Sequence, residues 1–164
     1  MTIWTEMSSP VGPLRLIGDG AALTGLYLSP DRYGPIEFPE DARGSDPVLA
    51  EAVRQVNAYF DGALQEFALP LAPAGTSFQR RVWDALCEIP YGTTISYLDL
   101  ARRLSNERAV RAVGAANGRN PISIIIPCHR VMGSNGSLVG YGGGLERKRW
   151  LMDHETRIAG VVLS

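Results

Sequence analysis

Cys128 is the residue of this sequence whose neighbours best suit nucleophilic chemistry. It lies between Pro127 and His129 and is followed by Arg130. A cysteine attacks as the thiolate, and the pKa of a free thiol is about 8.5, so a nearby base is needed. The His129 imidazole can accept the thiol proton, and the Arg130 guanidinium adds positive charge nearby. Because adjacent side chains usually point apart, a bridging water could join the thiol to the imidazole.

An imidazole that acts as a base needs a third group to orient it. His154 and Glu155, near the end of the last predicted helix, are the two candidates for that role. The alternative is that Cys128, which follows the apolar run Ile-Ile-Ile-Pro, is a small buried residue without a chemical role. The immediate neighbours of the cysteine therefore leave both interpretations open.

The chain of 164 residues contains two cysteines, Cys87 and Cys128. Residues 1–9 lack the basic start and apolar run of a secretion signal, which favours free thiols in a cytoplasmic protein. His129 and His154 would bring the possible metal ligands to four, but their spacing matches no metal motif. We therefore expect no metal and no cofactor, and a structural role for Cys87. No apolar stretch reaches 18 residues, so no membrane-spanning helix is predicted.

Charge is distributed unevenly along the chain, although the net charge is −1. Residues 1–75 carry 4 basic and 10 acidic side chains, whereas residues 76–164 carry 12 basic and 7 acidic ones. All the basic residues of the second half except Lys148 are arginines. Arginine donates paired hydrogen bonds and stacks on planar groups, which suits nucleic-acid recognition. A solvated helical surface would produce the same asymmetry, so charge alone does not decide.

The amino-terminal part has the pattern of α/β structure. Its expected elements are strands at 3–7, 14–18 and 22–28, a loop at 29–47, a helix from an Asp46 cap to Phe60, a short strand at 66–71 and a linker at 72–75. Leu49, Val53, Val56 and Tyr59 or Phe60 form the apolar stripe of that helix.

The carboxy-terminal part is mostly helical. Its expected elements are a helix over 78–89 capped by Ser77, a helix over 97–104 capped by Ser96, a helix over 107–117, a buried strand or extended segment at 122–126, a glycine-rich segment at 133–144 and a helix over 145–155. Two short helices joined by a tight turn are the outline of a helix-turn-helix. Any small helical bundle offers the same outline.

The helix over 107–117 has an unusually small-sided surface, with alanine or glycine at positions 109, 112, 114, 115 and 116. Close packing against a neighbouring helix would explain this composition. The functional interpretation is that small residues let the helix approach a DNA backbone, with Arg111 as the one long side chain. Both interpretations predict a helix that packs closely on one side.

The order of motifs in the second half closely resembles the O6-alkylguanine-DNA alkyltransferase family. The matching segments are Phe78-Gln79, Val82-Trp83, Ile89-Pro90-Tyr91-Gly92, Ser96-Tyr97, Arg111-Ala112-Val113-Gly114, Asn117, Asn120-Pro121, Pro127-Cys128-His129-Arg130-Val131 and Gly140-Tyr141-Gly142-Gly143-Gly144-Leu145. Residues 9–16 also resemble the amino-terminal opening of the family. The resemblance is most specific from Thr76 to Glu155.

The resemblance implies a role for each residue of the reaction centre. Cys128 would accept the alkyl group, with guanine as the leaving group. His129 would be the base, acting through a water, and Glu155 would hold it in the right tautomer. Asn120 would tie the recognition helix to the active-site turn. Tyr97 would rotate the target nucleotide out of the stack and help protonate the departing base, because the alkylated oxygen is inaccessible inside the duplex.

The resemblance also implies how DNA and the flipped base are held. Arg111 would fill the gap in the duplex, and the small helix would enter the minor groove. The implied DNA contacts are Ser96, Tyr97, Arg111, Ala112 and Gly114, and the implied pocket residues are Val131, Tyr141, Gly142 and Gly143. Backbone amides near 141–143 would bond the guanine oxygen, and carbonyls of Cys128 and Val131 would accept from its exocyclic amine.

Two positions depart from the family pattern. Gly142 stands where several relatives carry serine, and Gly140 stands where some carry asparagine. These departures leave the tolerance for bulky alkyl groups open. The cysteine and histidine ligands of the zinc site found in some members are missing from the amino-terminal half, which agrees with the expectation of no metal. A glycine-rich segment can also cradle phosphate, but no Gly-Lys-Ser/Thr ending follows it here.

We therefore expect two domains. Residues 1–72 would form an α/β domain with a small antiparallel, ribonuclease-H-like sheet, and residues 76–164 a mostly α winged helix-turn-helix domain. The implied activity is the irreversible, single-turnover transfer of an alkyl group from O6-alkylguanine, and from O4-alkylthymine, in double-stranded DNA to Cys128. The protein would be a cytoplasmic monomer, nucleoid-associated when bound to DNA, with no membrane partner; clustering on DNA is left open.

Three other functions compete with this interpretation. A non-enzymatic lesion binder with the same framework would carry another residue in place of Cys128. A cysteine hydrolase using Cys128 and His129 would need an oxyanion hole and would not explain Arg111. A transcription regulator that relies on the helix-turn-helix alone would leave the cysteine without a role.

Overall fold

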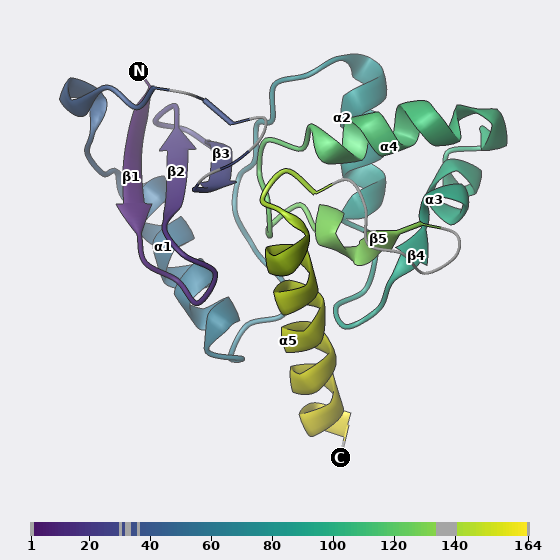
Figure 1. Cartoon of the computed structure of the whole chain (residues 1–164). Helices are drawn as coiled ribbons and strands as arrows, with labels where there is room; N and C mark the ends of the chain where they lie inside the picture. The colour runs from purple at the N-terminus through teal and green to yellow at the C-terminus, as the bar shows by residue number, and fades with distance from the viewer. Residues whose placement is uncertain (1, 30, 32–33, 36, 134–140, 164) are drawn as a thin grey trace.

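The computed structural model describes residues 2–29, 31, 34–35, 37–133 and 141–163, the last three by their backbone alone. Figure 1 shows a three-stranded sheet with helix α1 on one side of the molecule and helices α2, α3 and α4 on the other, with α5 between the two groups. We call the first group the amino-terminal lobe and the second the carboxy-terminal lobe. Both lobes contribute to one cluster of buried hydrophobic residues.

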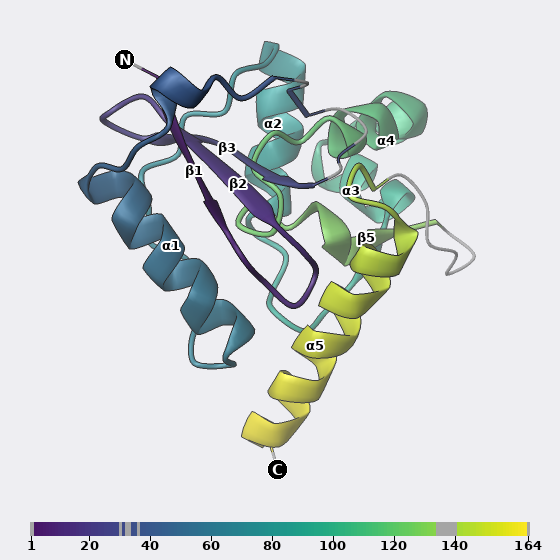
Figure 2. The same cartoon turned by 60° about the vertical axis from the view of Figure 1, so that its left-hand side comes forward.

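The amino-terminal lobe confirms the three predicted strands. Strands β1 (Ile3–Met7), β2 (Leu14–Gly18) and β3 (Leu23–Leu28) pair antiparallel in the order β1-β2-β3. Their alternating burial places Leu14 and Leu16 in the core. Helix α1 (Pro47–Phe60) packs across all three strands, as Figure 2 shows, and Asp46 caps it by accepting from the Leu49 amide. A short 3₁₀ helix, η1 (Glu40–Ala42), interrupts the predicted loop.

The short strand predicted at 66–71 is wrong. In the structure this segment forms only an isolated bridge between Leu71 and Leu23, with hydrogen bonds from Leu23 N to Pro70 O (2.8 Å) and from Ala72 N to Leu23 O (2.9 Å). A proline cannot donate to a ladder, so pairing at Pro70 is one-sided and does not extend. The segment instead connects the two lobes.

Three helices build the carboxy-terminal lobe. Helix α2 (Ser77–Leu86) ends three residues earlier than predicted, and its cap is Thr76 rather than Ser77, because the Thr76 hydroxyl and the Gln79 side chain form a capping box. Helix α3 (Tyr97–Arg103) is capped by Ser96 as predicted. The third predicted helix begins as a 3₁₀ turn, η2 (Glu107–Ala109), and continues as α4 (Val110–Gly118).

A two-residue parallel pair joins the helix-turn-helix to the centre of the molecule. Strand β4 (Ile95–Ser96) pairs with β5 (Val131–Met132), so Ile95 faces Val131. The 3₁₀ turn η3 (Cys128–Arg130) directly precedes β5. The start of α3 and the predicted nucleophile are therefore held side by side. Most of the predicted glycine-rich segment, 134–140, including Gly140, lies outside the described residues.

The segment 122–126 is buried, but the prediction of a strand or extended segment there is wrong. It folds back on itself, with Ile126 N bonded to Ile122 O at 3.0 Å and Ile124 in the left-handed region at φ 72°. The Asn120 side chain accepts from Ile122 N (3.0 Å) and donates to Ile126 O (2.7 Å). These side-chain bonds replace ladder bonds and offset the cost of a β-branched residue at positive φ.

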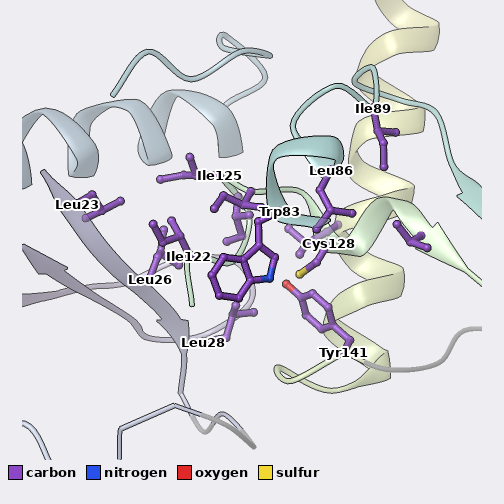
Figure 3. Close-up of a cluster of buried hydrophobic side chains, with 14 of the residues drawn as sticks. Leu23, Leu26, Leu28, Trp83, Leu86, Ile89, Ile122, Ile125, Cys128 and Tyr141 are labelled. Atoms are coloured by element: carbon purple, nitrogen blue, oxygen red, sulfur yellow. The ribbon is translucent and has the colours of Figure 1, made fainter. Parts of the chain in front are cut away.

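Helix α5 (Leu145–Leu163) runs eight residues beyond its predicted end at Glu155 and contacts both lobes. Arg147 Nη2 donates to Ser29 O at the end of β3 (2.6 Å), and the Trp150 ring packs against Phe60 of α1. Figure 3 shows the shared core behind these contacts, where side chains of β3, α2 and the 122–128 segment meet around Trp83. The position of α5 therefore depends on both lobes at once.

Candidate active site

Cys128 is the first residue of η3 and is only 4% exposed. Figure 3 shows its sulfur next to the Tyr141 hydroxyl, inside the core cluster. Burial raises the pKa of the Cys128 thiol to about 11, although a hydrogen bond from Asn120 and the charge of Lys148 act in the opposite direction. At neutral pH the thiol is therefore protonated, and a base must remove its proton before it can attack.

His129 is fully buried and is oriented by Glu155. Its Nε2 lies 2.7 Å from Glu155 Oε2. An ionised carboxylate can only accept, so Nε2 carries a proton, and in the neutral imidazole Nδ1 is left with its lone pair. Within the described part of the chain, Nδ1 has no hydrogen-bond partner. The imidazole is thus in the tautomer that a base requires.

The Glu155 carboxylate is also paired with Arg130. Arg130 Nε lies 2.8 Å from Oε1 and Nη2 lies 3.1 Å from Oε2, while Nη1 donates to Ile89 O at 2.7 Å. Burial would raise the pKa of Glu155, but the charges and hydrogen bonds of His129 and Arg130 outweigh it and hold that pKa well below its usual range. Glu155 is therefore ionised whenever His129 is to act.

The structure distinguishes between the two predicted orienting residues. His154 does not contact His129; its Nε2 lies 3.0 Å from the backbone oxygen of Tyr59. Arg130 was expected to add positive charge beside the thiol, and this expectation is wrong because its guanidinium is bonded to Glu155. A two-point pair with a carboxylate is the stronger interaction for arginine.

Lys148 supplies the positive charge that the sequence interpretation assigned to Arg130. It is the one lysine of the chain and is fully buried on α5. Its Nζ lies 5.9 Å from the centre of the Tyr97 ring, and it interacts electrostatically with Cys128. Burial lowers the pKa of Lys148 to about 8, against the effect of Cys128. Its uniqueness as a lysine among arginines was the available sequence signal.

Tyr97 lies at the start of α3 and is buried. Asn117 Nδ2 donates both to Tyr97 Oη and to Cys128 O, each at 3.4 Å. Burial raises the pKa of Tyr97 to about 12, so its hydroxyl is protonated at neutral pH and can donate a hydrogen bond. Asn117 was named only as part of the family resemblance, yet it connects the recognition helix to the turn that carries Cys128.

Of the residues predicted to contact DNA, all but the buried Tyr97 are exposed or half-buried. Arg111 and Ala112 are exposed on α4, and Gly114 is half-buried, where an added Cβ would lie 3.9 Å from the Tyr97 ring. Ser96 is half-buried at the cap of α3. The opposite side of α4 packs against α2, where Trp83 Nε1 donates to Ala116 O at 2.9 Å. The small residues of this helix thus include both packing and exposed positions.

The predicted pocket residues differ in burial, and Tyr141 is the one that interacts electrostatically with Cys128. Val131 is fully buried and Tyr141 nearly so, while Gly142 and Gly143 are half-buried. A Cβ at Gly142 would lie 2.8 Å from Oδ1 of Asp31, a residue of the amino-terminal lobe. Sequence interpretation missed Asp31, because it lies in a loop more than 90 positions from the nucleophile.

The described residues contain neither a metal-binding cluster nor a membrane-spanning helix. Within them, no three His, Cys, Asp or Glu side chains converge as a metal site would require. No helix in the described part of the chain is long and apolar enough to cross a bilayer. Cys87, for which a structural role was expected, is exposed at the carboxy-terminal cap of α2.

The fold and the site define a two-lobed protein in which a helix-turn-helix is joined to a buried Cys–His–Glu group. Comparison with known proteins narrows this class. Residues 2–73 match the family model "6-O-methylguanine DNA methyltransferase, ribonuclease-like domain", and residues 77–157 match "6-O-methylguanine DNA methyltransferase, DNA binding domain". The chain therefore belongs to the O6-methylguanine-DNA methyltransferase family.

Similar sequences and structures agree with this assignment. A methylated-DNA–protein-cysteine methyltransferase of Mycobacterium leprae is 51% identical over 153 residues, which cover 92% of this chain and 90% of that protein. One from Methanosarcina barkeri is 50% identical, covering 91% and 94%. The solved O6-methylguanine methyltransferase of Mycobacterium tuberculosis has a TM-score of 0.82 at 46% identity, covering 96% and 94%. A structure of that organism's OGT in complex with DNA has a TM-score of 0.84 at 46% identity, covering 94% and 93%.

Proposed function

We propose that this protein repairs alkylated DNA by direct reversal, moving the alkyl group of O6-alkylguanine, and of O4-alkylthymine, onto Cys128. Relatives that share about half of their residues with this chain are named methylated-DNA–protein-cysteine methyltransferases. The single observation that carries the residue assignment is the 2.7 Å contact between His129 Nε2 and Glu155 Oε2, which leaves Nδ1 without a partner among the described residues. A buried thiol with a raised pKa needs such a base.

The proposed transfer balances protons and electrons. The Cys128 thiol gives its proton, through a water, to His129 Nδ1, and the thiolate attacks the alkyl carbon. A C–S bond forms as the C–O6 bond breaks, and the electron pair of that bond passes to the guanine. Tyr97 passes a proton to the departing base and regains one from the proton that His129 took from the thiol, so its hydroxyl ends protonated and the guanine leaves neutral. Lys148 stabilises the negative charge while it resides on sulfur.

The flipped nucleotide would be held by the pocket residues described above. Backbone amides of Tyr141, Gly142 and Gly143 are the proposed donors to the guanine oxygen, and carbonyls of Cys128 and Val131 the proposed acceptors. The Cys128 carbonyl already accepts from Asn117 at 3.4 Å, and its second lone pair is available to a ligand. Asn120 would hold the turn that presents these groups. Base flipping is needed because the alkylated oxygen is inside the duplex.

Contacts to the duplex would come from the exposed side of the helix-turn-helix. Arg111 is the proposed wedge that replaces the flipped base, while Ser96, Ala112 and Gly114 let the backbone approach closely. We further propose a monomer that acts in the cytoplasm and nucleoid, with domains at 1–72 and 76–164. The thioether formed on sulfur is a poor target for water, so each molecule would act once and need no cofactor.

Intact-protein mass spectrometry tests the proposal. The protein is mixed with duplex DNA that contains one O6-methylguanine, and the modified peptide is mapped. A gain of one methyl group on Cys128, stopping at one equivalent, is expected, and Cys128→Ser should bind the DNA without gaining mass. Tight binding without a mass change would indicate a lesion binder instead. Neither binding nor transfer would remove the proposed function.

A further inference from the structure

Tyr59 joins the amino-terminal lobe to the Cys–His–Glu group. It lies on α1, is fully buried, and its hydroxyl oxygen is 2.6 Å from Oε2 of Glu155, a residue 96 positions away. The same Oε2 atom accepts the Nε2–H of His129. A side chain from one lobe therefore shares an oxygen atom with the base in the other.

The direction of this hydrogen bond is determined. Burial, followed by the charge of Glu155, raises the pKa of Tyr59 well above its usual value, so the phenol keeps its proton and donates. Glu155 Oε2 accepts from Tyr59, His129 and Arg130 Nη2, and Oε1 accepts from Arg130 Nε. Hydrogen bonds to an ionised group are about twice as strong as neutral ones. The carboxylate is thus anchored from both lobes.

Tyr59 is itself held in place by the residue next to Glu155. The His154 Nε2–H donates to the Tyr59 backbone oxygen at 3.0 Å, since a carbonyl can only accept. The Tyr59 ring also packs against Phe60, Phe67, Tyr91 and His154, with centroids 5.2–6.2 Å apart. Two consecutive residues of α5 therefore contact Tyr59, one through its backbone and one through its hydroxyl.

We propose that Tyr59 is a positioning residue for the alkyl transfer, through which the amino-terminal lobe sets the orientation and the effective charge of Glu155. This inference rests on the proposed function. The hydroxyl takes up part of the negative charge of Oε2. Without it, more of that charge acts on His129 and stabilises the imidazolium, so less neutral imidazole is available at a given pH.

Other titratable groups surround the carboxylate and must be considered in a pH experiment. They are His129 and Arg130 from η3, Tyr91 from the segment after α2, and His154 and Arg157 from α5, with Cys128 and Lys148 on the thiol side. Tyr91 offers a matched control. Its ring lies 6.2 Å from that of Tyr59, and its buried hydroxyl has no hydrogen-bond partner among the described residues.

The test compares Tyr59→Phe with Tyr91→Phe, because each keeps its ring and loses one hydroxyl. The rate of methyl transfer from O6-methylguanine duplex is measured from acid to alkaline pH. For Tyr59→Phe we expect a loss of about tenfold near neutral pH, a fraction of the ~10²–10⁴ that a general base contributes. We also expect the acid limb of the profile to move up by about half to one pH unit. Tyr91→Phe should follow the wild type.

A second readout separates this inference from the proposed function. The rate at which iodoacetamide modifies Cys128, followed by peptide mass to exclude Cys87, reports on the same base without DNA. If the wild type transfers no methyl group but Tyr59→Phe still shifts this profile, the proposed function fails, and only the action of Tyr59 on Glu155 and on the base is retained. The inference is overturned if both Tyr59→Phe profiles superimpose on the wild type, or if Tyr91→Phe shifts them equally. Thermal unfolding of each variant shows that the comparison is between folded proteins.

Discussion

Arg130 and Glu155 form a two-point ion pair in the interior, with Nε–Oε1 and Nη2–Oε2 separations of 2.8 and 3.1 Å. The two residues come from η3 and α5, and both are buried. A buried pair is strongly coupled, since removal of one partner leaves an uncompensated charge. The guanidinium therefore neutralises the carboxylate, while Oε2 also accepts hydrogen bonds from His129 and Tyr59.

Glu155→Gln should destabilise the protein and slow transfer. The variant leaves Arg130 buried without its counter-ion, which we expect to cost about 3–5 kcal/mol of unfolding free energy. Loss of the oriented imidazole should lower the transfer rate about 100-fold. Urea unfolding and single-turnover kinetics measure the two effects. Glu146→Gln, on the exposed start of the same helix, is the control and should change neither.

The effect of Glu155 on stability should depend on pH. Its folded-state pKa is held below the ordinary value of 4.5. A carboxyl of this kind contributes stability that is fully present above its unfolded-state pKa and is lost as the pH falls toward the folded value. The difference in unfolding free energy between the wild type and Glu155→Gln should therefore be constant near neutrality and shrink below about pH 4.5. A difference that is independent of pH in that range would contradict the assignment.

Lys148→Met should slow the reaction of Cys128, because the thiolate loses its cationic neighbour. We expect iodoacetamide to modify Cys128 about tenfold more slowly near pH 7. Arg149→Met, on the exposed face of α5, should leave this rate unchanged. Equal rates in all three proteins would show that Lys148 does not act on the thiol.

Lys148→Met should also change how the unfolding free energy depends on pH in the alkaline range. Because the folded-state pKa of Lys148 is about 8 and its ordinary value is 10.5, the unfolded chain holds the extra proton between these values. Unfolding free energy rises with pH wherever the unfolded state binds more protons. The wild type should therefore gain stability relative to Lys148→Met from about pH 8 to about pH 10.5. Urea titrations across this window measure the slope.

Asn120→Ala should unfold the turn that carries the nucleophile. It removes the partners of the Ile122 amide and the Ile126 carbonyl, both buried. With about 1–3 kcal/mol for each buried polar group left unsatisfied, we expect a loss of about 2–4 kcal/mol. Asn106→Ala is the matched control, since the Asn106 side chain makes no capping bond, and its effect should stay within about 0.5 kcal/mol. Equal losses would mean that the turn does not depend on Asn120.

Arg111→Ala should separate base flipping from the chemical step. Repair of O6-methylguanine in duplex DNA should slow by about tenfold or more, whereas the reaction with free O6-benzylguanine should be unaffected, since no duplex has to be opened. Arg54→Ala, a surface arginine of α1, should change neither rate. Equal losses on duplex DNA and on the free base would remove the wedge role from Arg111.

Local patterns in the sequence were sufficient for much of the fold. Alternating apolar residues located β1, β2 and β3, and the Ser96 cap located the start of α3, because these signals act over two to four residues. The capping box places the cap of α2 at Thr76, one residue before the predicted Ser77. Apolar periodicity does not resolve a difference of one residue. The prediction of a strand or extended segment at 122–126 was wrong for another reason. The Asn120 side chain there replaces the hydrogen bonds that a strand would make.

The sequence by itself determined which residue types could do chemistry, and the ordered motifs around Cys128 indicated the family. Tertiary structure decided how these residues are paired. It selected Glu155 over His154, assigned Arg130 to the carboxylate, and brought Lys148 and Tyr59 to the reaction centre. The physical reason is distance along the chain. His129 and Glu155 are 26 positions apart, and Tyr59 and Glu155 are 96 apart, so their contacts depend on how two lobes pack against α5 rather than on any local period.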